Sequence, residues 1–512
     1  MEAFLHPLQG LAEFEEIKKR CGANCGILNV SGCMESQKVH LMYGLSGLFP
    51  YHLILADDER NAKEIYEDYR FYDKNVYFYP AKDLLFFQAD IHGNLLIRQR
   101  MRVIRALLEQ EEVTVVTSID GCMDFLMPLE KIRSRLLHFK SDSVIDLDQL
   151  KEELVELGYE RTGQVELPGQ FSVRGGIIDI YPLTEDNPWR IELWDDEVDS
   201  IRSFDAESQR SLENVDEITI YPAVEKMDGE DMVSFLDYFP EEKTLVFLDE
   251  LNHLAENGEG VEEEYRQSRM HREEKGEANL PEQWLCGFQE LQKKLNRRNC
   301  VAVSALSPRR SGWKINEEFD LTVKSVDSYN SSFELLVKDL LQYKSQGYRI
   351  ALLSGSRTRA ERLAKDLSEE GLNAFYSQDM DRIISPGEIM VVYGHARRGF
   401  QYPLIKFAVM TETDIFGKEQ KKRKKKKKYS GNRIQDFAEL SIGDLVVHEK
   451  HGLGIYRGIE KVEVDRVVKD YIKIEYRGGS NLYILATQLD ALQKYSGSSE
   501  NAKTPKLNKL GG

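Results

Sequence analysis

The chain has 512 residues, and its 41% hydrophobic content is sufficient for several packed domains, because single cores rarely grow beyond about 250 residues. Its formal net charge is −18, but residues 418–512 carry a net +9 and the first 417 residues a net −27. This acidity excludes the main body as a general nucleic-acid binder, because such affinity comes largely from Lys and Arg. We expect any DNA contact to come from the basic tail or from a partner domain.

Targeting and redox features predict a cytoplasmic protein. The sequence has no run of about 18 apolar residues that could span a membrane, and its N-terminus lacks the apolar segment of a signal peptide. Six cysteines in so long a chain predict reduced thiols. Cys21, Cys25 and Cys33 lie close together, but they lack the paired short spacings of a structural zinc site, so we expect no bound metal.

Residues 1–125 and 213–326 are predicted to form one domain around a parallel sheet. Helical patterns at residues 57–70 and 95–109 alternate with short apolar runs. These runs are residues 39–43, 52–56, 76–79, 113–117 and, after a long insertion, 244–248. Strands separated by helices in this way are typical of a parallel sheet with crossover helices.

The insertion, residues 126–212, has a different pattern. Its short apolar segments are joined by Gly, Pro and Asp turns, which predicts an antiparallel α+β domain with strands at residues 170–174, 176–181, 189–194 and 197–201. Residues 327–417 are predicted to form a further small α/β domain, with helices at residues 333–346 and 357–371.

A basic linker, residues 418–437, is predicted to precede the last domain. The unbroken basic run from Lys421 to Lys428 should stay extended and solvated because its charges repel one another, although a nucleic-acid contact is an alternative. Residues 438–512 contain short alternating strands around glycines, which suggests a small, strongly curved β-barrel. The predicted fold class is therefore multidomain α/β with a C-terminal barrel.

One turn invites comparison with a phosphate-binding loop. Gly44 and Gly47 belong to the stretch GLSGLFP, residues 44–50, which we expect to connect a strand to a helix. An ATPase loop has the pattern G-x-x-x-x-G-K-[ST], and here Leu48, Phe49 and Pro50 replace the lysine and the hydroxyl. We therefore expect a degenerate loop with no bound cofactor, and no catalytic residue in this chain.

Several motifs carry a family resemblance. Residues 167–182 (LPGQFSVRGGIIDIYP) and 190–210, which begin RIELWDDEVDSI, closely resemble the second domain of the excision-repair protein UvrB and its relatives. Residues 443–454 (GDLVVHEKHGLG) resemble the domain shared by CarD-type transcription regulators and coupling factors. With FYPAKDL at 78–84 and TETDIFG at 411–417, the order of these motifs resembles the N-terminal half of the bacterial transcription-repair coupling factors (the Mfd family). The resemblance implies a degenerate RecA-like sheet domain and a Tudor-like, CarD-like barrel.

The resemblance also implies a surface that binds UvrA. Arg161 and Arg174 match arginines with which the UvrB family contacts UvrA, and Phe171 is expected to add an apolar anchor. The planar guanidinium suits this role because it pairs with a carboxylate through two hydrogen bonds. Ser172 stands where family members carry a further arginine. The alternative is that both arginines only solvate an exposed sheet face.

A second implied surface binds the β subunit of RNA polymerase. The matching strand is residues 459–464, with Lys461, Val462 and Glu463 as the expected contacts. An edge strand offers unpaired N–H and C=O groups to which a partner strand can pair, with side chains such as Val462 setting specificity. The alternative is that Val462 points into the barrel core.

These implications together predict an adaptor that docks on stalled RNA polymerase and recruits UvrA. In the family, an ATP-dependent DNA translocase motor follows the polymerase-binding domain, and ATP and Mg²⁺ belong to that motor. The sequence stops before it, so we expect this chain alone to be no enzyme. A helicase-like enzyme is an alternative, against which the degenerate loop and the acidic body argue. A stand-alone CarD-like regulator would leave the long preceding segment without a purpose.

Overall fold

The computed structural model describes residues 1–21, 26–82, 94–224, 232–274, 285–308, 312–417, 431–433, 440, 443–448, 452–464, 467–476, 481–485 and 492–495. The chain divides into two compact units, one of residues 1–82 and 99–420 and the other of residues 83–98 and 421–512. Among the described residues, no helix combines the length and the apolarity needed to cross a membrane.

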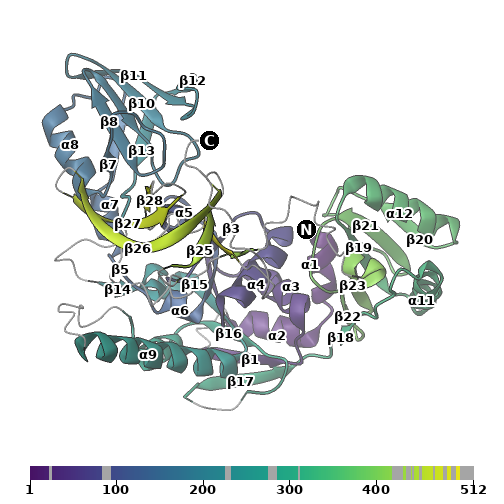
Figure 1. Ribbon diagram of the computed structural model, residues 1–512. Helices are drawn as coiled ribbons and strands as arrows, with labels where there is room; N and C mark the ends of the chain where they lie inside the picture. Colours follow the sequence, from purple (N-terminus) through teal and green to yellow (C-terminus); the bar gives the residue numbers. More distant parts are fainter. Residues whose placement is uncertain are drawn as a thin grey trace, which may run out of the picture. The chain divides into compact units, whose positions relative to one another are not determined.

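A seven-stranded sheet, parallel throughout, is the centre of the first unit (Figure 1). Its order is β17-β1-β16-β15-β2-β4-β3. Most strands are buried along their whole length, as is usual when both faces of a parallel sheet are covered. The strands are β1 (Ile27–Ser31), β2 (Tyr51–Ala56), β3 (Val76–Tyr79), β4 (Val113–Ser118), β15 (Thr244–Asp249), β16 (Cys300–Val303) and β17 (Ile315–Asp320).

The helices of this domain confirm the alternating pattern, with one exception. They are α1 (Glu2–Leu8), α2 (Ala12–Cys21), α3 (Glu35–Ser46), α4 (Glu59–Tyr72), α5 (Asn94–Glu109), α6 (Ile119–Cys122), α9 (Leu251–Glu274) and α10 (Phe288–Leu295). Residues 39–43, predicted as a strand, lie inside α3. The prediction is wrong because α3 is buried on nearly all sides, and a short buried helix and a buried strand give the same apolar run.

The inserted segment forms the predicted antiparallel sheet, in the order β12-β11-β10-β9-β8-β7, with one parallel pair at its β7 edge. One face carries the buried residues Phe171, Ile178 and Ile191, and the opposite face is polar. Its strands are β7 (Glu160–Arg161), β8 (Gln170–Arg174), β9 (Ile177–Ile180), β10 (Trp189–Trp194), β11 (Glu197–Phe204) and β12 (Ser211–Val215). Short pairs β6 (Leu137–Lys140) with β13 (Glu217–Ile220) and β5 (Phe125–Leu126) with β14 (Val233–Ser234), and helices α7 (Leu129–Ser134) and α8 (Leu147–Glu156), accompany it.

A third sheet, of mixed strand direction, has the order β18-β22-β23-β19-β21-β20. Its strands are β18 (Lys324–Ser325), β19 (Arg349–Ser354), β20 (Asn373–Tyr376), β21 (Glu388–Tyr393), β22 (Phe400–Tyr402) and β23 (Phe407–Thr411), with helices α11 (Phe333–Gln346), α12 (Arg357–Glu369) and α13 (Glu412–Phe416). Helix α11 ends at Gly347, whose φ of 77° is the left-handed conformation that glycine favours at this position. Side chains of α1–α4 form one continuous apolar core with residues of both this sheet and the seven-stranded sheet.

The second unit contains a six-stranded antiparallel sheet in the order β24-β29-β25-β26-β27-β28. Its strands are β24 (Gly431–Arg433), β25 (Leu445–His448), β26 (Gly452–Val464), β27 (Val467–Glu475), β28 (Asn481–Leu485) and β29 (Leu492–Tyr495). The basic run from Lys421 to Lys428 lies outside the described residues. The fold class is therefore α/β with a parallel seven-stranded sheet and further smaller sheets.

Candidate protein-binding sites

The polar face of the inserted sheet is organised around the carboxylate of Asp179 on β9. This carboxylate is fully buried and accepts a hydrogen bond from Arg174 Nη2 at 2.7 Å. Arg190 on the neighbouring strand donates twice, from Nε at 2.6 Å and from Nη2 at 2.9 Å. The three residues are adjacent across β8, β9 and β10, so the sheet register itself brings them together.

Arg190 is fixed more firmly than Arg174. Its guanidinium lies 4.3 Å from the centre of the Phe204 ring, and its hydrogen bonds to Asp179 raise its pKa above the usual value. Arg174 contacts Asp179 only through Nη2 and keeps 46% of its side-chain surface exposed. Arg190 therefore holds Asp179 in place, and Asp179 orients the exposed Arg174.

A second ion pair extends this face. Arg202 on β11 donates to Glu192 on β10, with Nη1 2.7 Å from Oε2. The hydrogen bond from Arg202 lowers the pKa of Glu192 below its ordinary value. The face thus presents arginines whose positions are set by neighbouring carboxylates, an arrangement suited to a partner that offers further carboxylates.

The structure separates the residues predicted to bind UvrA. Arg174 is exposed on the polar face, and Arg161 is exposed on the edge strand β7. Arg161 on β7 pairs with Phe171 on β8, so it lies on the side of the sheet that carries Phe171, opposite to Arg174. Phe171 itself is fully buried, and the prediction that it serves as an exposed apolar anchor is wrong. Its physical role is packing, because alternate residues of β8 face opposite sides of the sheet.

Ser172, where a family arginine was expected, is also buried. Its hydroxyl donates to the carbonyl of Gly163 at 3.0 Å, and it pairs with Asp179 across the strands. This position supports the loop before β8. It contributes no charge to the exposed surface.

Strand β26 contains the residues predicted to bind RNA polymerase. Lys461, Val462 and Glu463 pair antiparallel with residues of β27, and their side chains lie outside the described part of the structure. Strand β25 pairs with β26 only along residues 452–455. Along residues 459–464, the described strands pair with β26 on one side only, which is the arrangement that strand addition requires.

The predicted phosphate-like turn is not at a strand-to-helix junction. Gly44 lies inside α3, and Gly47 caps the end of that helix. A Cβ on Gly44 would lie 2.5 Å from Leu8 Cδ1, so this glycine permits close helix packing. The turn lines a cavity of about 490 Å³ at the end of the sheet where β2 and β4 begin. Ligands of parallel sheets bind at the opposite, carboxyl end.

The strand-to-helix junction that sequence reasoning missed is at residues 32–39, between β1 and α3. Its sequence, GCMESQKV, matches G-x-x-x-x-G-K-[ST] in the first glycine and in Lys38. Gln37 and Val39 replace the second glycine and the hydroxyl residue. The retained lysine at this spacing was the signal that could have located the junction.

Lys38 is held by acidic groups of the protein. Its Nζ lies 2.7 Å from Asp249 Oδ1 and 2.6 Å from Glu250 Oε1, at the carboxyl end of β15. Burial lowers the pKa of Lys38, but the two carboxylates raise it by more, so the ammonium is charged. In an ATPase the equivalent lysine reaches the terminal phosphates. Here the same charge is neutralised within the chain.

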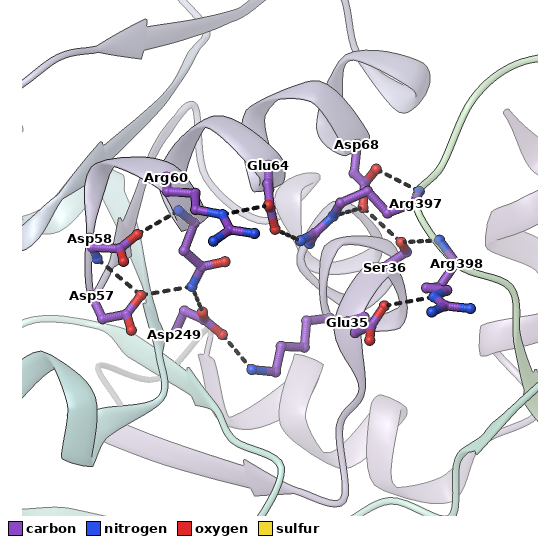
Figure 2. A network of polar contacts seen from close by, with 12 residues as sticks. Glu35, Ser36, Asp57, Asp58, Arg60, Glu64, Asp68, Asp249, Arg397 and Arg398 are labelled. Carbon is purple, nitrogen blue, oxygen red and sulfur yellow. Dashed lines mark hydrogen bonds and ion pairs between the residues drawn. The ribbon is translucent and has the colours of Figure 1, made fainter. Parts of the chain in front are cut away.

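The first turn of α3 also connects to the third sheet, as Figure 2 shows. Arg397 donates from its backbone N–H and from Nε to Asp68 on α4, both at 3.0 Å, and also pairs with Glu64. The N–H of Arg398 donates to Ser36 Oγ at 3.2 Å. Gln37, in the position of the second phosphate-loop glycine, donates to the Tyr402 hydroxyl at 2.9 Å. Two side chains of the β1–α3 junction, Ser36 and Gln37, therefore bind protein groups.

Among the described residues, no group of three or more His, Cys, Asp or Glu side chains is arranged to hold an ion. Cys21 and Cys33 are buried, neither forms a disulfide in the described part of the chain, and Cys25 lies outside the described residues. Burial raises the pKa of the Cys33 thiol to about 12, so it is protonated at neutral pH.

Comparison with known proteins places both surfaces in named domains. Residues 137–225 match the UvrB interaction domain, and residues 440–496 match the CarD-like/TRCF RID domain. The transcription-repair-coupling factor of Bacillus subtilis (strain 168) is 30% identical over 94% of this chain and 47% of its own length. Those of Staphylococcus epidermidis (strain ATCC 35984) and Staphylococcus aureus (strain MRSA252) are 29% and 28% identical, over 90% and 86% of this chain and 44% and 42% of their own lengths.

The chain is homologous to the transcription-repair-coupling factors. It spans about half the length of the coupling factors that it matches. The Asp179-centred face lies within the UvrB interaction domain, and β26 lies within the CarD-like/TRCF RID domain. The coupling-factor resemblance read from the motifs is therefore confirmed.

Proposed function

We propose that this chain is a protein-binding adaptor in transcription-coupled DNA repair. Its RID-like sheet docks on RNA polymerase, through the β subunit, and its UvrB-like sheet recruits UvrA. The single observation that carries this proposal is that one chain contains both matched domains, each with a binding surface of suitable chemistry. The first is the exposed, oriented Arg174, and the second is the half of β26 that is paired on one side.

Arg174 is suited to bind a partner carboxylate at low entropic cost. Its guanidinium is already oriented by Asp179, while nearly half of its side-chain surface remains exposed. Such preorganisation improves affinity because less side-chain freedom is lost on binding. In this proposal Arg161, exposed at the β7 edge, makes a separate contact with UvrA.

Residues 459–464 are suited to strand addition. A partner strand of the polymerase would pair with the backbone groups of β26 on the side away from β27, and Val462 would set side-chain specificity. In this proposal the six-stranded sheet is the small CarD-like barrel, and residues 418–437 are its basic linker. DNA contact by Lys421 to Lys428 remains a prediction.

The seven-stranded domain is, in this proposal, a degenerate RecA-like scaffold without nucleotide chemistry. Gln37 and Val39 remove the glycine and the hydroxyl that a phosphate loop requires, and Lys38 is paired with Asp249 and Glu250. We expect purified chain to hydrolyse ATP at the background rate with and without DNA. Turnover above background would refute this part of the proposal.

The decisive experiment is capture of each partner by purified variants. Arg174→Glu should abolish capture of UvrA and leave capture of RNA polymerase unchanged, and Val462→Asp should do the reverse. Matched controls are Arg362→Glu on the exposed face of α12 and Val155→Asp at an exposed position of α8, each with the same chemical change as one of the two test variants. Loss of neither partner, or of both together, would refute the assignment of the two surfaces.

A further inference from the structure

A tryptophan stands almost fully exposed at the end of β10. The side chain of Trp194 is 80% exposed, whereas Trp313 is buried. A large aromatic side chain normally buries most of its surface, and exposed tryptophans are enriched at the centres of protein interfaces.

The register of the sheet places Trp194 on the same face as Arg174. Arg174 and Glu192 both pair with Ile177, from opposite sides, so all three lie in one row. Trp194 is two residues beyond Glu192 on β10, and the bulge between them places its extra residue, Asp199, on β11. The alternation of β10 therefore continues, and Trp194 faces the same side as Glu192. By strand geometry the two positions are separated by about 10 Å across the sheet and about 7 Å along it, a distance that one partner easily covers.

A second exposed apolar residue lies across Glu197 from Trp194. Val144 and Trp194 both pair with Glu197, Val144 from a neighbouring segment and Trp194 from β10. The side chain of Val144 is 72% exposed. Cross-strand neighbours of one residue lie on the same face, so these two side chains form an apolar strip interrupted by one carboxylate.

The backbone under this strip is held firmly. Ile145 N–H donates to the Asp196 carbonyl and Val198 N–H donates to the Ser143 carbonyl, both at 2.8 Å. Asp195, at the hairpin turn, has a φ of 61°, which aspartate tolerates better than most residues. The indole is therefore presented on a rigid hairpin, which lowers the cost of binding.

We propose that Trp194 and Val144 are the apolar anchor of the surface on which Arg174 lies, in the role first expected of Phe171. This inference rests on the proposed function, and its occupant is UvrA. The partner surface must offer a pocket for the indole and a carboxylate for Arg174. It must also offer basic groups, because Asp195, Asp196 and Glu197 surround the tryptophan.

The test is the affinity of purified UvrA for the full chain, measured by calorimetry. Trp194→Ala should weaken binding by about 30-fold and Trp194→Phe should restore most of the affinity, because a ring would again fill the pocket. Asp196→Lys should weaken binding more at low salt than at high salt. The matched control is Leu404→Ala, at an apolar side chain that is 65% exposed in the third sheet domain and should leave the affinity unchanged.

The outcomes separate this inference from the proposed function. If Arg174→Glu weakens UvrA binding and Trp194→Ala does not, the anchor is wrong and the adaptor role stands. If the unaltered chain does not bind UvrA, the proposed function fails first. If Trp194→Ala instead weakens capture of RNA polymerase, the strip belongs to a different partner and the inference is overturned. Unchanged thermal unfolding of Trp194→Ala would show that the loss of binding is not a loss of folding.

Discussion

His40 makes the junction of the first and third sheet domains sensitive to acid. Its imidazole is fully buried on α3, with Nε2 2.9 Å from the Phe4 carbonyl and Nδ1 3.2 Å from the Tyr402 hydroxyl. A carbonyl can only accept, so Nε2 carries the proton and Nδ1 accepts from Tyr402. The rings of Phe400 and Phe407 lie 5.2 and 5.8 Å away, and this apolar setting favours the neutral imidazole.

The size of this loss of stability in acid follows from the pKa of His40. Burial lowers the pKa of His40 from 6.5 to about 4. Between these values the unfolded chain binds a proton that the folded chain excludes, so stability is complete above pH 6.5 and falls as the pH approaches 4. The loss in free energy of unfolding should be about 1.4 kcal/mol at pH 5.5 and about 2.5 kcal/mol at pH 4.5.

Urea denaturation at pH 7.5, 6.5, 5.5 and 4.5 measures this effect by difference. The unaltered chain and His40→Gln are compared at each pH, so that the titration of all other groups cancels. The advantage of the unaltered chain should shrink by about 2.5 kcal/mol between pH 7.5 and 4.5. The control is Gln342→Asn, at an exposed position on α11, which changes no titratable group and for which the difference should stay constant. A constant difference for His40→Gln would refute the reasoning.

Three further predictions concern buried ion pairs. Asp179→Asn should destabilise the UvrB interaction domain by about 3 kcal/mol in urea denaturation, because two arginines lose their shared carboxylate, and should also weaken UvrA capture. Lys38→Met should lower the free energy of unfolding by a similar amount of about 3 kcal/mol without changing capture of UvrA or of RNA polymerase. Adding Asp249→Leu should recover part of this loss, and no recovery would contradict a charge effect. Arg397→Ala, which removes the side-chain ion pairs to Asp68 and Glu64 across the junction, should increase protease cleavage near residues 394–399 while the far side of the third sheet stays protected.

Local sequence patterns were enough to predict most of the helices and strands and to recognise the family. The helix at residues 333–346 was predicted with the bounds that the structure has, because its apolar spacing and the glycine that follows it are local signals. The strands from Gln170 to Trp194 were likewise found from alternation and turn residues. The motif order identified the coupling-factor relationship before any geometry was known.

Contacts between residues far apart in the sequence determine features that local sequence patterns could not predict. Lys38 and Asp249 are separated by more than two hundred positions, and only the parallel order of β1, β16 and β15 brings them together. The strands of Phe171 and Trp194 both alternate between apolar and polar residues in the sequence. Which face of their sheet is covered by other elements decides that Phe171 is buried and Trp194 is exposed. The sequence determines which segments become strands and helices, because those preferences are local. The tertiary structure decides which of their faces meets solvent, because burial depends on which other elements pack against them.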